Sequence, residues 1–482
     1  MIVYGRTRLP TVVGRGAHGG GIGERAVQGF DSSSDPGVSF DQSGNGWYSF
    51  LVFNAADEGG GRVVVNRLPS TATSASGFQA ANTGLPVRSL ADFQDKNMID
   101  VDTSPSSPHF GRIYVVWTED QPSGVQNIVI SSCDTRPNGA AFCSDPDNWS
   151  SPAQVTDSPG GSFSDADVAA APNGDLYVVW WNYADNRVDG NKCAAASDCR
   201  ASSSWAADQT IRSLNSDGGR PIPFFCPILA APGGRVSPIP SIDVSEAAGN
   251  QGRVFVATGD ILSSPGTTRC FASGDDGSGY TPLTTDKPWD VFVGSAPNAL
   301  PSSLAEATGA LSGDAFLPWL DVDQSTGAPE AAFYKTDPDA SRLTALFSHT
   351  AIGNTGTPSG SVSAVATGAS NYGGALSTGF DYGDYEQVAA ANGKSYPVWT
   401  DGRDLASNGE IFALAANLNL TAGAAEGAET SVDTSGSGSS TRMLAGANNL
   451  IGNPMLAFLS TNDGASFSGP VGMPLNADLQ TL

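Results

Sequence analysis

Residues 164–185 read SDADVAAAPNGDLYVVWWNYAD, and the fold can be predicted from this segment and its repeats. A short apolar strand leads into a polar turn that contains Gly174, and a second strand rich in Tyr, Val and Trp follows. Two such strands on either side of a glycine turn are typical of an antiparallel pair. We therefore expect a paired unit here, with Asp185 directly after its second strand.

The same pattern recurs six times along the chain, at intervals of roughly 60 to 80 residues. The copies begin at Ser34, Asp95, Ser164, Pro238, Leu317 and Asp384, and their turns fall at Asp41, Asp102, Ala171, Ser245, Asp323 and Ala391. Each interval has room for four strands of about 5–6 residues with loops. A β-sandwich seldom repeats one motif so often, and a β-helix has far shorter periods. Because stacking around an axis buries the faces of such sheets, the repeat predicts one domain over residues 1–482, a six-bladed β-propeller of four-stranded antiparallel blades.

The composition agrees with short strands and excludes some partners. The chain has 58 glycines, 31 prolines and a net charge of −25. Phosphate backbones and anionic membranes need clustered Lys and Arg, so we expect no nucleic-acid partner. No apolar run approaches the roughly 20 residues of a membrane helix. The start of the chain lacks the apolar segment of a signal peptide, so an exported form would be a mature or trimmed chain.

The cysteines indicate an oxidising compartment. Their number is even and their spacing is close, which favours three disulfides, Cys133–Cys143, Cys193–Cys199 and Cys226–Cys270. A zinc site is the alternative, but no CxxC or HxxxH spacing occurs. We therefore expect a secreted or cell-surface protein.

Three segments lie outside the repeats. Residues 421–440 are small and polar, which predicts a flexible loop. Residues 453–471, NPMLAFLSTNDGASFSGPV, return to a strand pattern and are expected to form the outer hairpin of the last blade. The N-terminal segment TRLPTVV is expected to pair with that blade and close the ring.

Two further motifs resemble the Asp box, S-x-D-x-G-x-T-W, of the sialidase-like family. They are SGDDGSGY at residues 273–280 and STNDGASF at residues 460–467. In such a motif an Asp or Asn caps turn amides and a glycine takes a positive φ. Phrases such as GRIYVVWTED and KSYPVWTDGRD also resemble secreted bacterial proteins of the exo-α-sialidase-like, BNR-repeat kind. The resemblance implies a sialidase-like propeller and, in that family, Asp boxes that are structural.

Propeller topology then orders the candidate site. Residues that open the first strand of a blade and residues that close the second strand share one rim around the channel mouth. Aromatic faces suit sugar rings, and carboxylates suit hydroxyls, acid–base work or a hard cation. The candidate substrate-binding residues on this rim are Asp35, Asp95, Asp120, Asp165, Asp185, Arg187, Trp117 and Trp181.

The resemblance also implies a catalytic set, which this sequence matches only in part. A retaining sialidase uses three arginines for the substrate carboxylate, an Asp acid/base, and a Tyr nucleophile with a Glu partner. The candidate catalytic residues here are Asp384, Tyr385, Asp401 and Arg403, with Arg8, Arg88, Arg187 and Arg220 as further arginines. Tyr385 with Glu386 is the best Tyr/Glu pair in the sequence. Because adjacent strand residues point to opposite faces, Asp384 or Glu410 is the alternative partner of Tyr385.

Two functions follow from these patterns. The first is a secreted, sialidase-like glycoside hydrolase that acts at the channel mouth on extracellular glycans and needs no cofactor. The second is a non-catalytic propeller that binds a glycan, a protein or another cell-surface polymer, with calcium in the acidic mouth. A fold alone does not decide between them. Lyase or lactonase chemistry is a third, less favoured interpretation.

Overall fold

A computed structural model of the chain describes residues 32–473 except for fifteen short gaps. The gaps are residues 55–60, 80–83, 90, 158–160, 218, 225, 263–269, 271–288, 309–312, 337–342, 373–381, 404–408, 415–416, 422–426 and 450–454. The N-terminal segment expected to close the ring and the motif at 273–280 lie outside the described residues.

The described residues form seven antiparallel sheets that serve as blades, and each runs outward in chain order. Blade 1 contains β1 (Ser32–Phe40), β2 (Gly46–Phe53) and β3 (Arg62–Leu68). Blade 2 contains β4 (Phe93–Val101), β5 (Arg112–Asp120), β6 (Gln126–Asp134) and β7 (Ala153–Gln154). Blade 3 contains β8 (Phe163–Ala170), β9 (Leu176–Asn182), β10 (Arg187–Cys193) and β11 (Gln209–Ser213). Blade 4 contains β14 (Ser241–Val244), β15 (Arg253–Ile261), β16 (Trp289–Pro297) and β17 (Ala305–Glu306).

The remaining blades have the same order. Blade 5 contains β18 (Ala315–Asp323), β19 (Ala328–Thr336), β20 (Ala345–Ala351) and β21 (Ser363–Ala364). Blade 6 contains β22 (Gln387–Ala391), β23 (Lys394–Asp401), β24 (Glu410–Ala413) and β25 (Leu418–Asn419). Blade 7 contains β26 (Gly427–Ser435), β27 (Arg442–Asn449), β28 (Leu456–Ser460) and β29 (Ser468–Gly472). A separate hairpin, β12 (Cys226–Ile228) with β13 (Ala231–Val236), stands between blades 3 and 4. Short 3₁₀ turns occupy Ala75–Gly77, Ala140–Ser144, Pro146–Asn148, Ser202–Ser204 and Gly438–Ser440.

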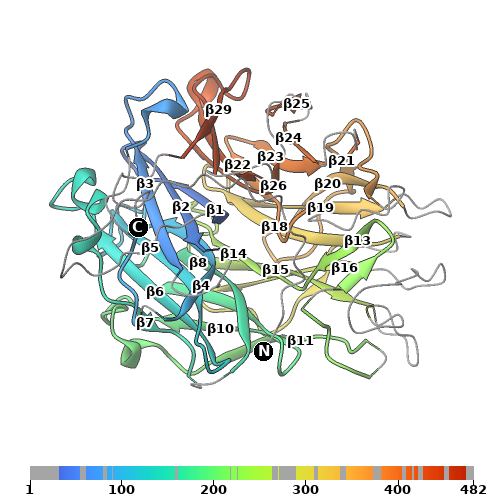
Figure 1. Cartoon of the computed structure of the whole chain (residues 1–482), viewed down its shortest axis with the longest axis horizontal. Helices are drawn as coiled ribbons and strands as arrows, with labels where there is room; N and C mark the ends of the chain where they lie inside the picture. The colour runs from blue at the N-terminus through green and yellow to red at the C-terminus, as the bar shows by residue number, and fades with distance from the viewer. Residues whose placement is uncertain are drawn as a thin grey trace, which may run out of the picture.

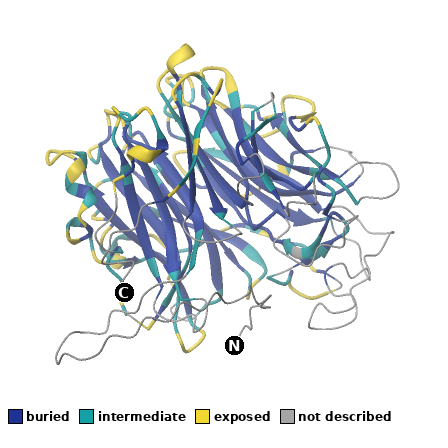
Figure 2. Cartoon of the chain, turned by 45° about the horizontal axis from the view of Figure 1, so that its top comes forward, coloured by how far each residue is buried: buried dark blue, intermediate teal, exposed yellow. Residues whose placement is uncertain are grey.

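The blades close into a ring through their innermost strands. Neighbouring blades are in contact along the series β1, β4, β8, β14, β18, β22 and β26, and β26 contacts β1 again. Figure 1 shows the sheets arranged around a common centre, and Figure 2 shows that the strands are buried while the connecting turns are exposed. The arrangement is a β-propeller. None of the described helices is long and apolar enough to cross a membrane.

The prediction of six blades is wrong, because the described residues form seven. The missed blade begins with β26, which lies inside the 421–440 segment expected to be a flexible loop. Its small polar side chains are buried by hydrogen bonds instead of apolar packing, since Thr430 Oγ1 donates to the Val398 carbonyl (2.7 Å) and Ser431 Oγ to Gln387 Oε1 (2.7 Å). The outer hairpin expected at 453–471 is present as β28 and β29.

Aspartates on the inner strands join successive blades. At five of the seven junctions an aspartate of an inner strand accepts a backbone N–H from the inner strand of the next blade, across 2.5–2.9 Å. These pairs are Asp100 with Ala170, Asp167 with Ile242, Asp243 with Val322, Asp321 with Ala390, and Asp433 with Phe40. The aspartates line the central channel, which contains a cavity of about 100 Å³.

Burial of these carboxyls disfavours their charged form. It raises the pKa of Asp167 and Asp243 to about 7 and that of Asp433 to about 6. Burial, followed by the neighbouring charge of Asp243, also raises the pKa of Asp321 well above its ordinary value. The channel therefore holds protons that an unfolded chain would release near neutral pH.

The three predicted disulfides, Cys133–Cys143, Cys193–Cys199 and Cys226–Cys270, are all present. The first two close loops between the third and fourth strands of blades 2 and 3. In each of these loops a tryptophan indole donates to the carbonyl of the second cysteine, Trp149 to Cys143 (3.0 Å) and Trp205 to Cys199 (3.3 Å). The third disulfide holds the hairpin β12–β13.

The turn at residues 460–467 has the local geometry expected of it. Asn462 Oδ1 accepts the Ser466 amide (3.0 Å), and Gly464 has φ 77°. The turn joins β28 to β29, on the face where the first and second strands of each blade are also connected. We call this face the hairpin face, and we call the opposite face, where first strands begin and second strands end, the mouth face.

Candidate functional site

The inner strands begin with a recurrent distortion at the mouth face. In five blades a β-bulge interrupts the pairing of the first two strands, and a non-glycine residue there adopts a positive φ. These residues are Asp35 (61°), Lys96 (55°), Asp165 (56°), Leu317 (51°) and Glu429 (52°). Each such conformation costs on the order of 1–3 kcal/mol, and bulges of this kind re-aim side chains next to functional sites. Four of these five residues are charged. The strand pattern of the sequence alone does not explain why charged residues occupy the bulges.

The bulges bring charged side chains from several blades together, and we call this group the mouth cluster. Its members are Asp35, Asp95, Lys96, Asp165, Arg235, Asp384 and Glu429. The Lys96 side chain forms an ion pair with Asp384, and the Lys96 amide donates to Asp35 Oδ2 (2.9 Å). One residue of blade 2 thus contacts carboxylates of blades 1 and 6.

Arg235 supplies the second cation of the mouth cluster. It lies on β13, outside the blades, and its guanidinium contacts Asp384 and Glu429 Oε1 (3.2 Å). The Asp384 amide donates to the same Glu429 oxygen (3.1 Å). Asn448 completes the group, because it donates to Glu429 Oε2 and accepts the Asp35 amide (3.0 Å).

The electrostatics move the pKa values of two adjacent carboxyls apart. Burial, followed by the charge of Asp35, raises the pKa of Asp95 to about 8. Burial also disfavours the ionised form of Asp35. The positive charge of Lys96 and the hydrogen bonds from Ser34 and the Lys96 amide outweigh this effect, so the pKa of Asp35 is lowered. Asp95 therefore holds a proton at neutral pH while Asp35 is ionised, and such a divergence is characteristic of acid–base sites.

The other acidic members respond mainly to burial. Burial raises the pKa of Asp165 and of Glu429, with the charge of Lys96 acting in the opposite direction. Asp165 Oδ2 is buried without a hydrogen-bond partner among the described residues. Beside it, a cavity of about 10 Å³ lies between Lys96, Trp319 and Tyr385, which leaves room for about one water molecule.

Of the predicted rim residues, the structure brings Asp35, Asp95, Asp165 and Asp384 into this cluster. Lys96, Arg235, Glu429 and Asn448 were missed. The run DKN at residues 95–97 places Lys96 beside a candidate carboxylate, and this is the one signal in the sequence that could have indicated it. Nothing in the local sequence of Arg235 or Glu429 indicates a rim position, because a hairpin insertion and a bulge place them there.

Tyr385 lies next to the mouth cluster but has the contacts of a packing residue. Its hydroxyl donates to the Pro36 carbonyl (3.2 Å), and burial raises its pKa well above the ordinary value. The Glu386 carboxyl is hydrogen-bonded to Thr430 Oγ1 (2.6 Å). Burial raises the pKa of Glu386 to about 8. The two side chains therefore do not form a nucleophile pair.

Asp401 and Arg403 bind each other within blade 6. Asp401 Oδ2 accepts hydrogen bonds from Arg403 Nη2 and from Trp399 Nε1 (3.1 Å). The Arg403 guanidinium lies 4.3 Å from the centre of the Phe412 ring. These contacts pair the two charges with each other inside the blade.

The remaining candidates are spread along the rim. Trp117 and Trp181 are fully buried, so neither offers a ring face to a sugar. Arg187 is paired with Asp185 (3.0 Å) and Asp189 (2.7 Å), and Asp120 is partly exposed at the end of β5.

The arginines do not converge as a sialidase would require. Arg88 is bound to Glu119 through its Nε (2.7 Å), and Arg8 lies outside the described residues. Arg220 is exposed and forms an isolated bridge with Asp217. Within the described ranges, Arg235 is the one arginine in contact with the mouth cluster. Those same ranges contain no group of three or more His, Cys, Asp or Glu residues arranged to hold a metal ion.

Comparisons with known proteins give only distant likenesses. No family model matches the chain, and no curated protein matches it. Among solved structures, the Hadza microbial sialidase Hz136 is 12% identical with a TM-score of 0.42, over 77% of this chain and 63% of that one. The GH43 endo-arabinanase from Bacillus licheniformis is 12% identical with a TM-score of 0.32, over 68% and 97%. Prolyl oligopeptidase B from Galerina marginata is 10% identical with a TM-score of 0.41, over 93% and 52%. At these values the likenesses carry no argument about function, which rests on the mouth cluster.

Proposed function

We propose that this chain is an extracellular glycoside hydrolase that acts on a neutral glycan at the mouth face. The observation that carries the proposal is the convergence of five carboxyls and two cations, from five blades and one inserted hairpin, at one end of the channel. Four of these seven residues, Asp35, Lys96, Asp165 and Glu429, lie on strained bulges. Buried charges on strained backbone cost stability, and such costs are characteristic of functional sites.

The carboxyls have different roles in this proposal. Asp95 is the general acid, because it is partly exposed and holds a proton at neutral pH. Asp35 is the ionised neighbour that keeps this proton in place. Asp165, whose Oδ2 has no hydrogen-bond partner among the described residues, is the second carboxylate that glycoside hydrolysis requires.

The charges of the mouth cluster favour a neutral sugar. Lys96 and Arg235 are both already paired with carboxylates, so neither is free to bind a substrate carboxylate. An anionic sugar would instead meet an excess of acidic side chains. We therefore propose hydroxyl recognition and not the sialic-acid specificity that the family resemblance implied.

A panel of fluorogenic glycosides tests this function. We expect release of the fluorophore from at least one neutral glycoside, no release from the sialoside, and loss of turnover in Asp95→Asn. Turnover of the sialoside alone would overturn the neutral-substrate proposal. Absence of turnover on every glycoside, with intact folding, would favour a binding protein.

The alternative is a non-catalytic propeller that binds a glycan or a protein and holds calcium at its mouth. The ion pairs that Lys96 and Arg235 form with Asp384 favour this alternative, because the same contacts could serve only to stabilise the fold. Calcium that raises the melting temperature of the wild type but not of Asp165→Asn would support this alternative. The three disulfides are consistent with an extracellular location for either function.

A further inference from the structure

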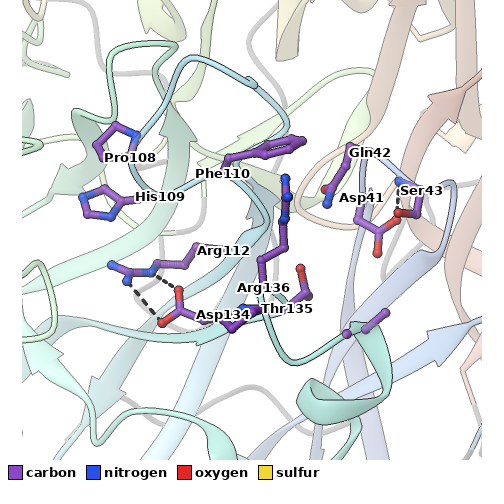
Figure 3. Close-up of a pocket in the computed structure, with 13 residues that line it drawn as sticks. Asp41, Gln42, Ser43, Pro108, His109, Phe110, Arg112, Asp134, Thr135 and Arg136 are labelled. Carbon is purple, nitrogen blue, oxygen red and sulfur yellow. Dashed lines mark hydrogen bonds and ion pairs between the residues drawn. The ribbon is translucent and has the colours of Figure 1, made fainter.

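A second pocket lies on the hairpin face, at the opposite end of blades 1 and 2 from the mouth cluster. Its volume is about 730 Å³, within the range of small-ligand sites. The β1–β2 turn, the β4–β5 connection and the loop after β6 form its walls. We call it the hairpin-face pocket, and its polar lining includes Gln42, Ser43, His109, Arg112 and Arg136 (Figure 3).

Both carboxylates that line this pocket are already satisfied. Asp41 accepts the amides of Ser43 and Asn45 (2.9 Å each) and the Asn45 side chain (2.8 Å). Asp134 is held by both branches of the Arg112 guanidinium (2.6 and 3.2 Å). Neither carboxylate is therefore available to neutralise a further cation.

Of the two arginines that line the pocket, Arg112 is paired with Asp134 and Arg136 is not paired with either carboxylate. It is exposed, and it has no hydrogen bond or ion pair with any described residue. Its guanidinium lies 4.7 Å from the centre of the Phe110 ring, and Figure 3 shows it extended between Phe110 and Gln42. Because the ring contact holds the side chain in place, its fork of N–H donors is presented to the pocket at little cost in conformational entropy.

His109 adds an acceptor to this set of donors. Its Nε2 lies 3.0 Å from the Ala195 carbonyl, and because a carbonyl only accepts, Nε2 carries the hydrogen and Nδ1 is the acceptor. Burial, followed by the charge of Arg112, lowers the pKa of His109, so the ring is neutral at pH 7. A neutral imidazole of this tautomer accepts a hydrogen bond from a hydroxyl.

We propose that the hairpin-face pocket is a second binding site, for a saccharide that carries a carboxylate. Arg136 binds the carboxylate through its two parallel N–H groups, which match carboxylate geometry. The Gln42 amide, the Ser43 hydroxyl and the His109 Nδ1 bind the hydroxyls of the sugar. A uronate-containing oligosaccharide has both kinds of group. The site is independent of the mouth cluster, which is on the other face.

Calorimetric titration of the full chain with a glucuronate-containing oligosaccharide, and with its glucose counterpart, tests the proposal. We expect the acidic sugar to bind and the neutral one to bind at least roughly tenfold more weakly, as the loss of a charge-assisted pair predicts. Arg136→Gln abolishes this difference, and raised salt reduces it. Gln42→Glu on the exposed turn also weakens binding, because it places a carboxylate beside Arg136.

Arg253→Gln is the matched control, since it removes the same charge from the same face in blade 4, where Arg253 contacts Asn250 (3.0 Å) and Ser295 (3.1 Å). We expect it to bind like the wild type. Equal binding of the two sugars, or unchanged binding in both Arg136→Gln and Gln42→Glu, would overturn the proposal. Asp95→Asn should leave this binding intact, so a failure here and a failure of the proposed hydrolase are distinguishable.

Discussion

Lys96 and Asp384, separated by 288 residues, form a buried ion pair that joins blade 2 to blade 6 across the mouth of the propeller. Arg235, from the hairpin between blades 3 and 4, binds the same carboxylate. Three distant parts of the chain therefore meet at one oxygen of Asp384. Any change at this carboxylate acts on the fold and on the candidate site together.

Asp384→Asn is expected to destabilise the protein strongly. Removing one partner of a buried ion pair leaves the other charge uncompensated, at a cost of about 3–5 kcal/mol. The free energy of unfolding from denaturant titration measures it. Asp198→Asn, which breaks an exposed pair with Arg200 (2.8 Å), is the control and should cost no more than about 1 kcal/mol. Equal losses in the two variants would mean that the buried Lys96–Asp384 pair contributes no more than an exposed pair.

Asp95→Asn is expected to lower kcat by about 10²–10⁴-fold, the usual contribution of a general acid. In the wild type the rate should fall as the pH rises through about 8, because Asp95 then loses the proton it donates. A pH–rate profile on the best neutral glycoside measures both effects. If the residual rate of Asp95→Asn still falls as the pH rises through about 8, a group other than Asp95 is the general acid.

The channel aspartates predict an unusual dependence of stability on pH. Their folded-state pKa values are raised, to about 7 for Asp167 and Asp243 and about 6 for Asp433, so the folded chain binds more protons than the unfolded chain. Their contribution is complete below about pH 4 and is lost as the pH rises through 6 to 7. We expect the melting temperature to be higher at pH 5 than at pH 8.

Asp321→Asn tests the origin of this effect. An amide at this position is neutral at every pH, so the variant should be less sensitive to the change from pH 5 to pH 8 than the wild type. The free energy of unfolding of Asp321→Asn should therefore differ less between pH 5 and pH 8, because in the wild type burial raises the pKa of Asp321 well above its ordinary value. A melting temperature that rises from pH 5 to pH 8 in the wild type would contradict the assignment.

Removal of the Cys226–Cys270 disulfide is expected to abolish turnover. This disulfide anchors the hairpin that carries Arg235, and a free hairpin would release the contacts of Arg235 with Asp384 and Glu429. The double variant Cys226→Ser/Cys270→Ser should lose activity and about 2–5 kcal/mol of stability. Removing Cys193–Cys199, which closes a loop on the hairpin face, is the control and should leave turnover unchanged. Full activity in the first variant would show that the blades alone position Arg235.

Local sequence predicts part of the fold well. The turn glycines and the apolar strands around them predict paired strands, because an antiparallel hairpin is built from neighbouring residues. Blade 7 lacks this signal because β26 is made largely of Gly, Thr, Ser and Asp, and its burial comes from partners such as Gln387 in another blade. An apolar pattern cannot indicate a strand that is buried through hydrogen bonds.

The candidate site, like the fold, can be predicted from local sequence only in part. Strand ends place Asp35, Asp95, Asp165 and Asp384 on one face, and that follows from the alternation of strand direction alone. Their partners Arg235 and Glu429 come from an inserted hairpin and a bulge, and neither has a signature in its own segment. The burial of Trp117 and Trp181 likewise depends on neighbouring sheets.

The repeated strand pairs, the three disulfides and the face on which the acidic residues gather follow from the amino-acid sequence alone. These depend on residues close together in the chain or on the simple up-and-down order of strands. The number of blades, the identity of the neutral carboxyls and the cations that pair with the ionised ones depend on the folded chain. Those properties arise from groups hundreds of residues apart, since burial and charge act through space and not along the chain.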